Sequence, residues 1–161
     1  MKKSEIKIAI LKNVTFFKIS GHAGAENADT IIEAFNKSIK NSYHLFIIDM
    51  AECDYIDSTF IGTLLVMNKN TNEHKGKMVL LNITNQVYEI LHNMFLDKFF
   101  NIETSDTFKN LKSLKDIKHR KSEKDMLENM IKAHEELSST SQKNKETFQD
   151  LVLFLKSQKI E

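Results

Sequence analysis

The chain of 161 residues has no proline, no tryptophan, four glycines and a single cysteine, Cys53. One cysteine excludes an intramolecular disulfide and any zinc site built from several thiolates. The histidines follow neither the HExxH spacing nor another recognised ligand spacing, so we expect no bound metal ion. They are His22, His44, His74, His92, His119 and His134.

The chain also lacks an excess of charge of either sign. Its 23 basic and 22 acidic residues give a formal charge of +1. Proteins that bind nucleic acid depend on a basic surface, so we expect no nucleic-acid partner. No run approaches the ~18 apolar residues of a membrane span, and the first residues, MKKSEIKIAILKN, lack the apolar centre of a signal peptide. We therefore expect a cytoplasmic protein with no membrane contact.

What the chain does have is enough apolar residues for a core, since 41% of its side chains are hydrophobic. A domain typically takes about 100 to 150 residues, so we expect one domain with an appendage. A change of texture near Lys115 divides the chain into a domain at residues 1–116 and a helical extension at residues 117–161.

The most informative stretch runs from Leu45 to Met67. An apolar run, LFIID, predicts a buried strand; the polar residues MAECDY then predict a link, and IDSTFIGTLLVM predicts a helix that begins at Ser58. The first turn of a helix favours anions because its N–H groups are unpaired and its dipole is positive there. A phosphate on Ser58 would be stabilised at this position, but the local pattern alone favours the interpretation that Asp57 or Ser58 serves only as the helix cap.

The remaining pattern alternates strands and helices, which is typical of an α/β fold. Two strands form a hairpin, and a helix then crosses over to a parallel neighbour. Later strands are short and wholly apolar, so we expect them inside the sheet. The expected strands are 5–11, 14–20, 45–49, 77–83 and 99–102, and the expected helices begin at Ala25 or Asn27, at Ser58, after the cap Thr84, and at Ser105 or Asp106.

The glycines mark two expected breaks. Gly21 to Gly24 predicts a loop, but two glycines without a following lysine and hydroxyl do not make a phosphate-binding loop, so no nucleotide cofactor is expected. Gly76 follows the helix that begins at Ser58, and we expect it to end that helix with a positive φ angle.

The extension at residues 117–161 has no glycine and no strand-like run. Its apolar residues keep helical spacing on both sides of Ser138 to Ser141, four hydroxyl residues that favour turns and caps. We therefore expect a C-terminal αα-hairpin whose second helix is capped by Ser141.

Several of these segments together resemble the STAS domain, a module shared by bacterial anti-sigma-factor antagonists, stressosome subunits and the cytoplasmic tails of sulfate transporters. The resemblance covers roughly residues 5 to 115 and implies a mixed β-sheet with helices packed against it. The matching parts are Asp49, the run Asp57-Ser58-Thr59-Phe60-Ile61-Gly62, Gly76, the run Val79-Leu80-Leu81-Asn82, and the run Leu96-Asp97-Lys98-Phe99-Phe100.

The resemblance implies a non-enzymatic switch in bacterial transcription regulation. In the antagonist branch the serine after the motif aspartate is phosphorylated, and that serine is Ser58 here, with Thr59 as the secondary candidate. The implied partners are an anti-sigma factor or serine protein kinase, bound when Ser58 is unphosphorylated, and a PPM-type phosphatase that resets the switch. The alternative is a constitutive scaffold, in which the C-terminal helices form a homodimer or a larger signalling complex.

The resemblance also assigns motif or partner-binding positions to Asp57, Phe60, Gly62 and Gly24. Asp57 is expected to cap the helix and shape the acceptor loop. Phe60 replaces the first motif glycine, and it either presents an apolar side chain to the partner or enters the core. Gly24 lies where the family pattern carries an acid, so the surface that meets the partner is expected to differ from that of relatives.

Overall fold

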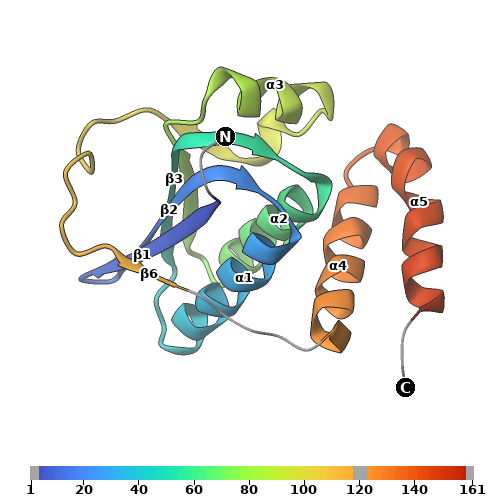
Figure 1. The fold of residues 1–161 in the computed structure, drawn as a ribbon, viewed down its shortest axis with the longest axis horizontal. Helices are drawn as coiled ribbons and strands as arrows, with labels where there is room; N and C mark the ends of the chain where they lie inside the picture. The colour runs from blue at the N-terminus through green and yellow to red at the C-terminus, as the bar shows by residue number, and fades with distance from the viewer. Residues whose placement is uncertain (1–3, 118–122, 159–161) are drawn as a thin grey trace.

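The computed structural model describes residues 4–117 and 123–158, and its centre is a six-stranded sheet in the order β5-β4-β3-β2-β1-β6. Strands β2 to β5 run parallel, while β1 is antiparallel to both β2 and β6 (Figure 1). The expected mixed α/β fold is therefore confirmed. The strands are β1 Glu5–Leu11, β2 Val14–Ala23, β3 Leu45–Ile56, β4 Lys77–Leu81, β5 Asn101–Glu103 and β6 Lys115–Asp116.

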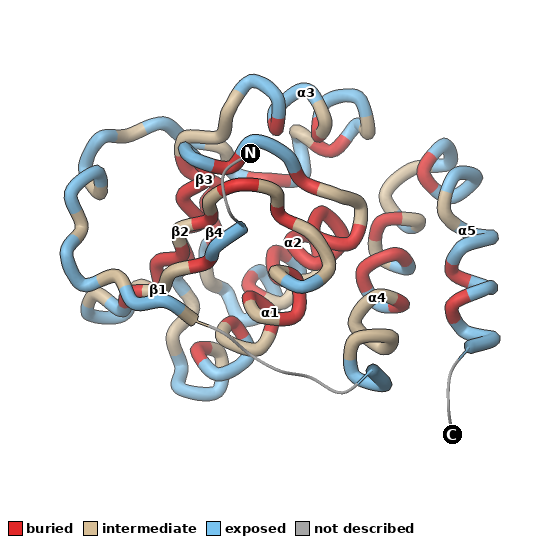
Figure 2. The backbone as a smooth tube through the Cα atoms, viewed as in Figure 1, coloured by how far each residue is buried: buried red, intermediate tan, exposed pale blue. Residues whose placement is uncertain are grey.

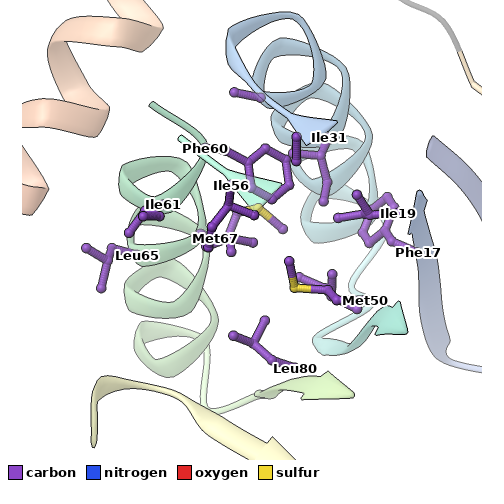
Figure 3. Close-up of a cluster of buried hydrophobic side chains, with 14 of the residues drawn as sticks. Phe17, Ile19, Ile31, Met50, Ile56, Phe60, Ile61, Leu65, Met67 and Leu80 are labelled. Atoms are coloured by element: carbon purple, nitrogen blue, oxygen red, sulfur yellow. The ribbon is translucent and has the colours of Figure 1, made fainter. Parts of the chain in front are cut away.

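Two helices, α1 (Ala25–Lys40) and α2 (Ser58–Glu73), cover one face of this sheet. The main core lies between them and the strands, and α3 (Asn85–Asn93), capped by Thr84 as predicted, closes one end of it. Figure 3 shows Phe60 of α2 pointing toward Ile31 and Ile56, whereas Ile61 and Leu65 point to another side of the same helix.

The C-terminal residues form the predicted αα-hairpin, made of α4 (Glu123–Ser138) and α5 (Gln142–Ser157). Ser141 is the N-cap of α5, and its hydroxyl accepts a hydrogen bond of 3.1 Å from the backbone N–H of Asn144. Helix α4 packs along α2, and α5 lies on the outer side of α4 (Figure 1). The helical extension that follows the proposed boundary at residue 116 thus packs, through α4, against α2 of the domain before the boundary.

The helix expected from Ser105 or Asp106 does not form. Residues 104–114 follow an irregular path and lead into β6, which pairs with β1. The apolar residues of this segment pack against Ala9, Phe16 and Leu81 on the second face of the sheet. The ring centroids of Phe16 and Phe108 lie 5.3 Å apart. Side chains with helical spacing thus cover a face of the sheet on which none of the described helices packs.

Two predicted loops are also wrong, because β2 and β3 are longer than expected. Strand β2 continues through Gly21 to Ala23, and β3 continues through the polar run MAECDY to Ile56. The two strands pair in parallel along this extension, with register shifts between Lys18 and Ser20 and between Gly21 and His22. Such irregularities break the alternation of apolar and polar residues by which a strand is recognised.

The prediction of a positive φ angle at Gly76 is wrong as well. The residue in the left-handed region is Lys75, with φ at 58°. Gly76 is needed for a different reason, since a Cβ atom there would lie 2.0 Å from the carbonyl oxygen of His44. The glycine thus permits the close approach of the chain before β3 to the chain before β4.

This pair of neighbours gives opposite predictions for stability. Gly76→Ala should lower the free energy of unfolding by about 1–3 kcal/mol, because the methyl group overpacks against backbone. Lys75→Gly should raise it by about 0.5–1 kcal/mol, because glycine adopts a positive φ without the steric cost of a side chain. Urea denaturation of both variants and the wild type measures the difference, and equal effects of one sign would contradict this interpretation.

Candidate functional site

The beginning of α2 carries the residues that the sequence singles out. Asp57 is the N-cap, and its Oδ1 accepts a hydrogen bond of 2.9 Å from the backbone N–H of Phe60. The backbone N–H of Asp57 in turn donates to the carbonyl of Ala23 at the end of β2, at 3.1 Å. Because Asp57 supplies the cap, the hydroxyl of Ser58, the first residue of α2, is not needed for that role.

Gly24 lies directly beside this cap. It is the N-cap residue of α1, and a Cβ atom on it would lie 2.9 Å from Oδ2 of Asp57. The parallel ends of β2 and β3 therefore place the first turns of α1 and α2 next to each other. A side chain at Gly24 would push into the carboxylate that holds the start of α2.

Ser58 has a partner that the sequence did not reveal. Its Oγ lies 3.1 Å from Nε2 of His134 in α4, a residue 76 positions away. Nδ1 of His134 lies 2.8 Å from the carbonyl oxygen of Met130. A carbonyl can only accept, so the proton of the neutral ring is on Nδ1, and Nε2 accepts the hydrogen bond that Ser58 donates.

Ser58 and His134 differ in exposure, which limits what the pair can do. Ser58 is half-buried, but His134 is only 1% exposed because its ring lies between Ser58 of α2 and Phe148 of α5. Thr59, the secondary candidate, is also buried, and its carbonyl accepts a hydrogen bond of 2.9 Å from the hydroxyl of Thr63. Of the two residues, Ser58 is therefore the more exposed.

Phe60 and Gly62, the two other motif positions on α2, both point inward. Phe60 is fully buried in the main core, which selects the second of the two alternatives considered for it. Gly62 is buried against α4, where an added Cβ atom would lie 2.2 Å from the carbonyl oxygen of Ala133. Neither residue meets solvent in this conformation.

Cys53 lies in the extended part of β3 and is completely buried. Burial raises the pKa of its thiol to about 11, and its Sγ lies 3.5 Å from the carbonyl oxygen of Tyr55. A nucleophilic cysteine needs the opposite shift, toward a thiolate at neutral pH. Cys53 is thus a core residue.

The described residues give no sign of a metal centre. Within 4–117 and 123–158, no three His, Cys, Asp or Glu side chains come together in a group that could hold an ion. His119 lies outside the described residues. No helix in those same ranges is long and apolar enough to cross a membrane.

Comparison with known proteins identifies the fold. A family model of the STAS domain matches residues 5–113, so α4 and α5 lie beyond the match. SpoIIAA of Bacillus, an anti-sigma factor antagonist, aligns in its unphosphorylated form with a TM-score of 0.58 at 13% identity, over 65% of this chain and 90% of its own. Its phosphorylated form aligns with a TM-score of 0.55 at 12% identity, over 65% of this chain and 94% of its own.

Two further solved structures give the same result. An anti-sigma factor antagonist of Mycobacterium paratuberculosis has a TM-score of 0.55 at 16% identity, over 63% of this chain and 86% of its own. A candidate antagonist of Thermotoga maritima has a TM-score of 0.58 at 18% identity, over 62% of this chain and 86% of its own. At these identities the likeness concerns the fold alone. No curated protein sequence matches the chain.

The buried thiol predicts a specific pH dependence. A folded-state pKa of about 11, against 9.0 for the ordinary thiol, means that Cys53 stabilises the fold below pH 9 and that this contribution is lost as the pH rises toward 11. Urea denaturation at pH values from about 8 to about 11 covers the interval between the two pKa values. Over this interval the free energy of unfolding should fall more steeply in the wild type than in Cys53→Ala. Parallel curves for the two proteins would show that the thiol is not buried as described.

Proposed function

The chain belongs to the STAS domain family, and on this premise we propose that it is a non-enzymatic protein-binding switch controlled by phosphorylation of Ser58. The observation that carries the proposal is the position of Ser58. It is the first residue of α2, it is half-buried rather than enclosed, and Asp57 relieves it of capping. In its unphosphorylated form the protein binds an anti-sigma factor or serine protein kinase, and in its phosphorylated form it releases that partner.

The electrostatics of the helix start support this assignment. A phosphate adds about −1.5 to −2 charges at neutral pH, and the N–H groups and dipole of a first helical turn stabilise such a charge. Asp57 already places a carboxylate beside Ser58, so the modified site would be strongly negative toward an approaching partner. An acidic partner surface would be repelled, which is how one modification can end binding.

The chemistry requires little of this chain. The kinase transfers the γ-phosphoryl group of ATP to Oγ of Ser58, ADP leaves, and the hydroxyl proton is released. A PPM-type phosphatase would return the group to water as inorganic phosphate and regenerate the hydroxyl. SpoIIAA, which has this fold, has been solved in both phosphorylation states.

Phosphorylation is tested by incubating the chain with a serine kinase of the anti-sigma class, ATP and Mg²⁺. We expect tandem mass spectrometry to find one phosphate, on Ser58, because Ser58 is the more exposed of the two candidate residues. Ser58→Ala should remain unmodified, and Thr59→Val should be modified like the wild type. The absence of phosphate from both Ser58 and Thr59, in the wild type and also in a variant in which α4 is displaced from α2, would contradict the proposal.

A second function, assembly through the C-terminal hairpin, is favoured by one observation. Leu153 and Phe154 stand on α5 with 66% and 61% of their surfaces exposed, and Figure 2 shows the outer side of α5 largely exposed. Adjacent exposed apolar side chains of this size are typical of an interface. A homodimer formed by two copies of α5 would bury them and would not require phosphorylation.

Sedimentation equilibrium of the full chain tests this alternative. If α5 forms a dimer, the wild type should associate as its concentration rises. The double variant Leu153→Glu, Phe154→Glu should remain monomeric, because dimerisation would bury its two added charges. Ile10→Glu is the control, since Ile10 is an exposed apolar residue (50%) on β1 rather than on α5. A wild-type chain that stays monomeric would rule out the dimer.

A further inference from the structure

The hairpin of α4 and α5 lies on the same part of α2 that carries Ser58. Nε2 of His134 accepts the hydrogen bond from Ser58, at 3.1 Å. One turn further along α2, the backbone of Ala133 lies against Gly62. The chain's own α4 therefore occupies the side of α2 from which a macromolecular partner would reach Ser58.

At Gly62 the fit between α2 and α4 leaves no space for an added group. A single methyl group at Gly62 would lie 2.2 Å from the carbonyl oxygen of Ala133, far inside van der Waals contact. The ring of His134 is itself held, by Met130 on its own helix and by Phe148 of α5, whose ring centre is 5.9 Å away. A phosphate on Ser58 would meet this buried ring, because Nε2 of His134 lies only 3.1 Å from the oxygen to which the phosphate would be attached.

Polar contacts at three other places fix the hairpin in this position. Nδ2 of Asn129 lies 2.5 Å from Oδ1 of Asp29, a buried residue of α1. Nζ of Lys69 on α2 lies 3.7 Å from Oε2 of Glu136 on α4. Nδ2 of Asn144, at the start of α5, donates to the carbonyl of Met94 at 2.9 Å.

We propose that the hairpin is a cover for the phosphoacceptor, so that docking of α4 on α2 and phosphorylation of Ser58 exclude each other. The inference rests on the proposed role of Ser58 and adds its regulation. In the covered state the hydroxyl is hydrogen-bonded to His134 and the kinase is kept from it. The effect is reciprocal: if docking of α4 on α2 disfavours phosphorylated Ser58, then a phosphate on Ser58 must weaken the docking of α4 by the same free energy.

The apolar side chains under α4 indicate what replaces it. Ile61 and Leu65 of α2 are buried and point to the side on which α4 lies (Figure 3). Release of α4 would expose them together with Ile131 and Leu137 of α4, which is unfavourable unless another surface covers them. The kinase or anti-sigma factor that binds this face of α2 must therefore present an apolar surface that competes with α4.

Hydrogen exchange tests the exclusion without any kinase. Ser58→Glu places a carboxylate where the phosphate would be, and the amides of residues 123–138 should then exchange about tenfold faster or more, because a hydrogen bond is lost and a charge is buried. Asn85→Glu is the matched control, since Asn85 is the first residue of α3, exposed and preceded by its own cap. Protection of α4 in Ser58→Glu equal to that in the wild type would overturn the proposal.

A second variant opens the cover from the other side of the contact. Gly62→Ala should displace α4 by collision with Ala133 while favouring α2, because alanine forms helices better than glycine. We expect faster exchange in α4, unchanged exchange in β2 to β4, and several-fold faster phosphorylation of Ser58 by the kinase used above. A displaced α4 with an unchanged phosphorylation rate would overturn the cover and leave the proposed function intact.

Different results would therefore refute the proposed function of Ser58 and the proposed cover. If Ser58 is not modified in either the wild type or Gly62→Ala, the proposed function is wrong, and the exchange of Ser58→Glu still decides whether charge on Ser58 and docking of α4 are compatible. If Ser58 is modified equally fast in both chains, access to it is not controlled by α4. If Ser58 is phosphorylated faster in Gly62→Ala than in the wild type, the result supports both the proposed function and the cover.

Discussion

The arrangement of the site depends on the absence of a side chain at Gly62. Two helices approach to backbone contact only where one of them has no Cβ atom in the way, and here α2 meets Ala133 of α4 at that point. His134 follows Ala133, so the close approach is also what brings an imidazole within 3.1 Å of Ser58. With any larger residue at position 62, α4 would have to move outward, and the contact with Ser58 would lengthen with it.

The parallel pairing of β2 and β3 determines where the start of α2, and with it Ser58, lies. Both strands end at the same edge of the sheet, where Gly24 begins α1 and Asp57 begins α2. Asp57 is tied to β2 through the carbonyl of Ala23 and to α2 through the N–H of Phe60. The residue before Ser58 is thus hydrogen-bonded to both β2 and α2, which fixes where α2 begins.

Much of this arrangement could be predicted from the sequence because it depends on local signals. The cap at Asp57, the start of α2 at Ser58 and the cap at Ser141 are set by hydroxyl or carboxylate residues before apolar helical stripes. The two C-terminal helices follow from the helical spacing of their apolar residues. The failures have a common cause. The extension of β3 depends on pairing with β2 through register shifts. The path of residues 104–114 depends on contacts that bury Phe16. Both involve residues far apart in the chain, so a short stretch of sequence does not reveal them.

The contact of Ser58 with His134 escaped prediction for the same reason, although its ingredients were present. His134 keeps helical spacing with the apolar residues of the first C-terminal helix, but nothing in the sequence indicates which surface that side of the helix meets. The position of Gly62 was a usable signal. A glycine in the middle of an apolar helix destabilises it by about 1 kcal/mol relative to alanine, so its presence indicates a close approach by another element.

The forces that hold α4 in place are of two kinds, and they have different consequences for a switch. Each polar contact stabilises docking by only about 0.5–1.5 kcal/mol, because Ser58, Asp29 and their partners regain hydrogen bonds to water when separated. The apolar contacts contribute more, since a fully buried leucine or isoleucine side chain is worth about 1.5–3 kcal/mol. The affinity of the hairpin for α2 is thus set by Ile61, Leu65, Ile131 and Leu137. Under the proposed switch, its response to phosphorylation would be set by the contact of Ser58 with His134, where a neutral hydroxyl would gain negative charge.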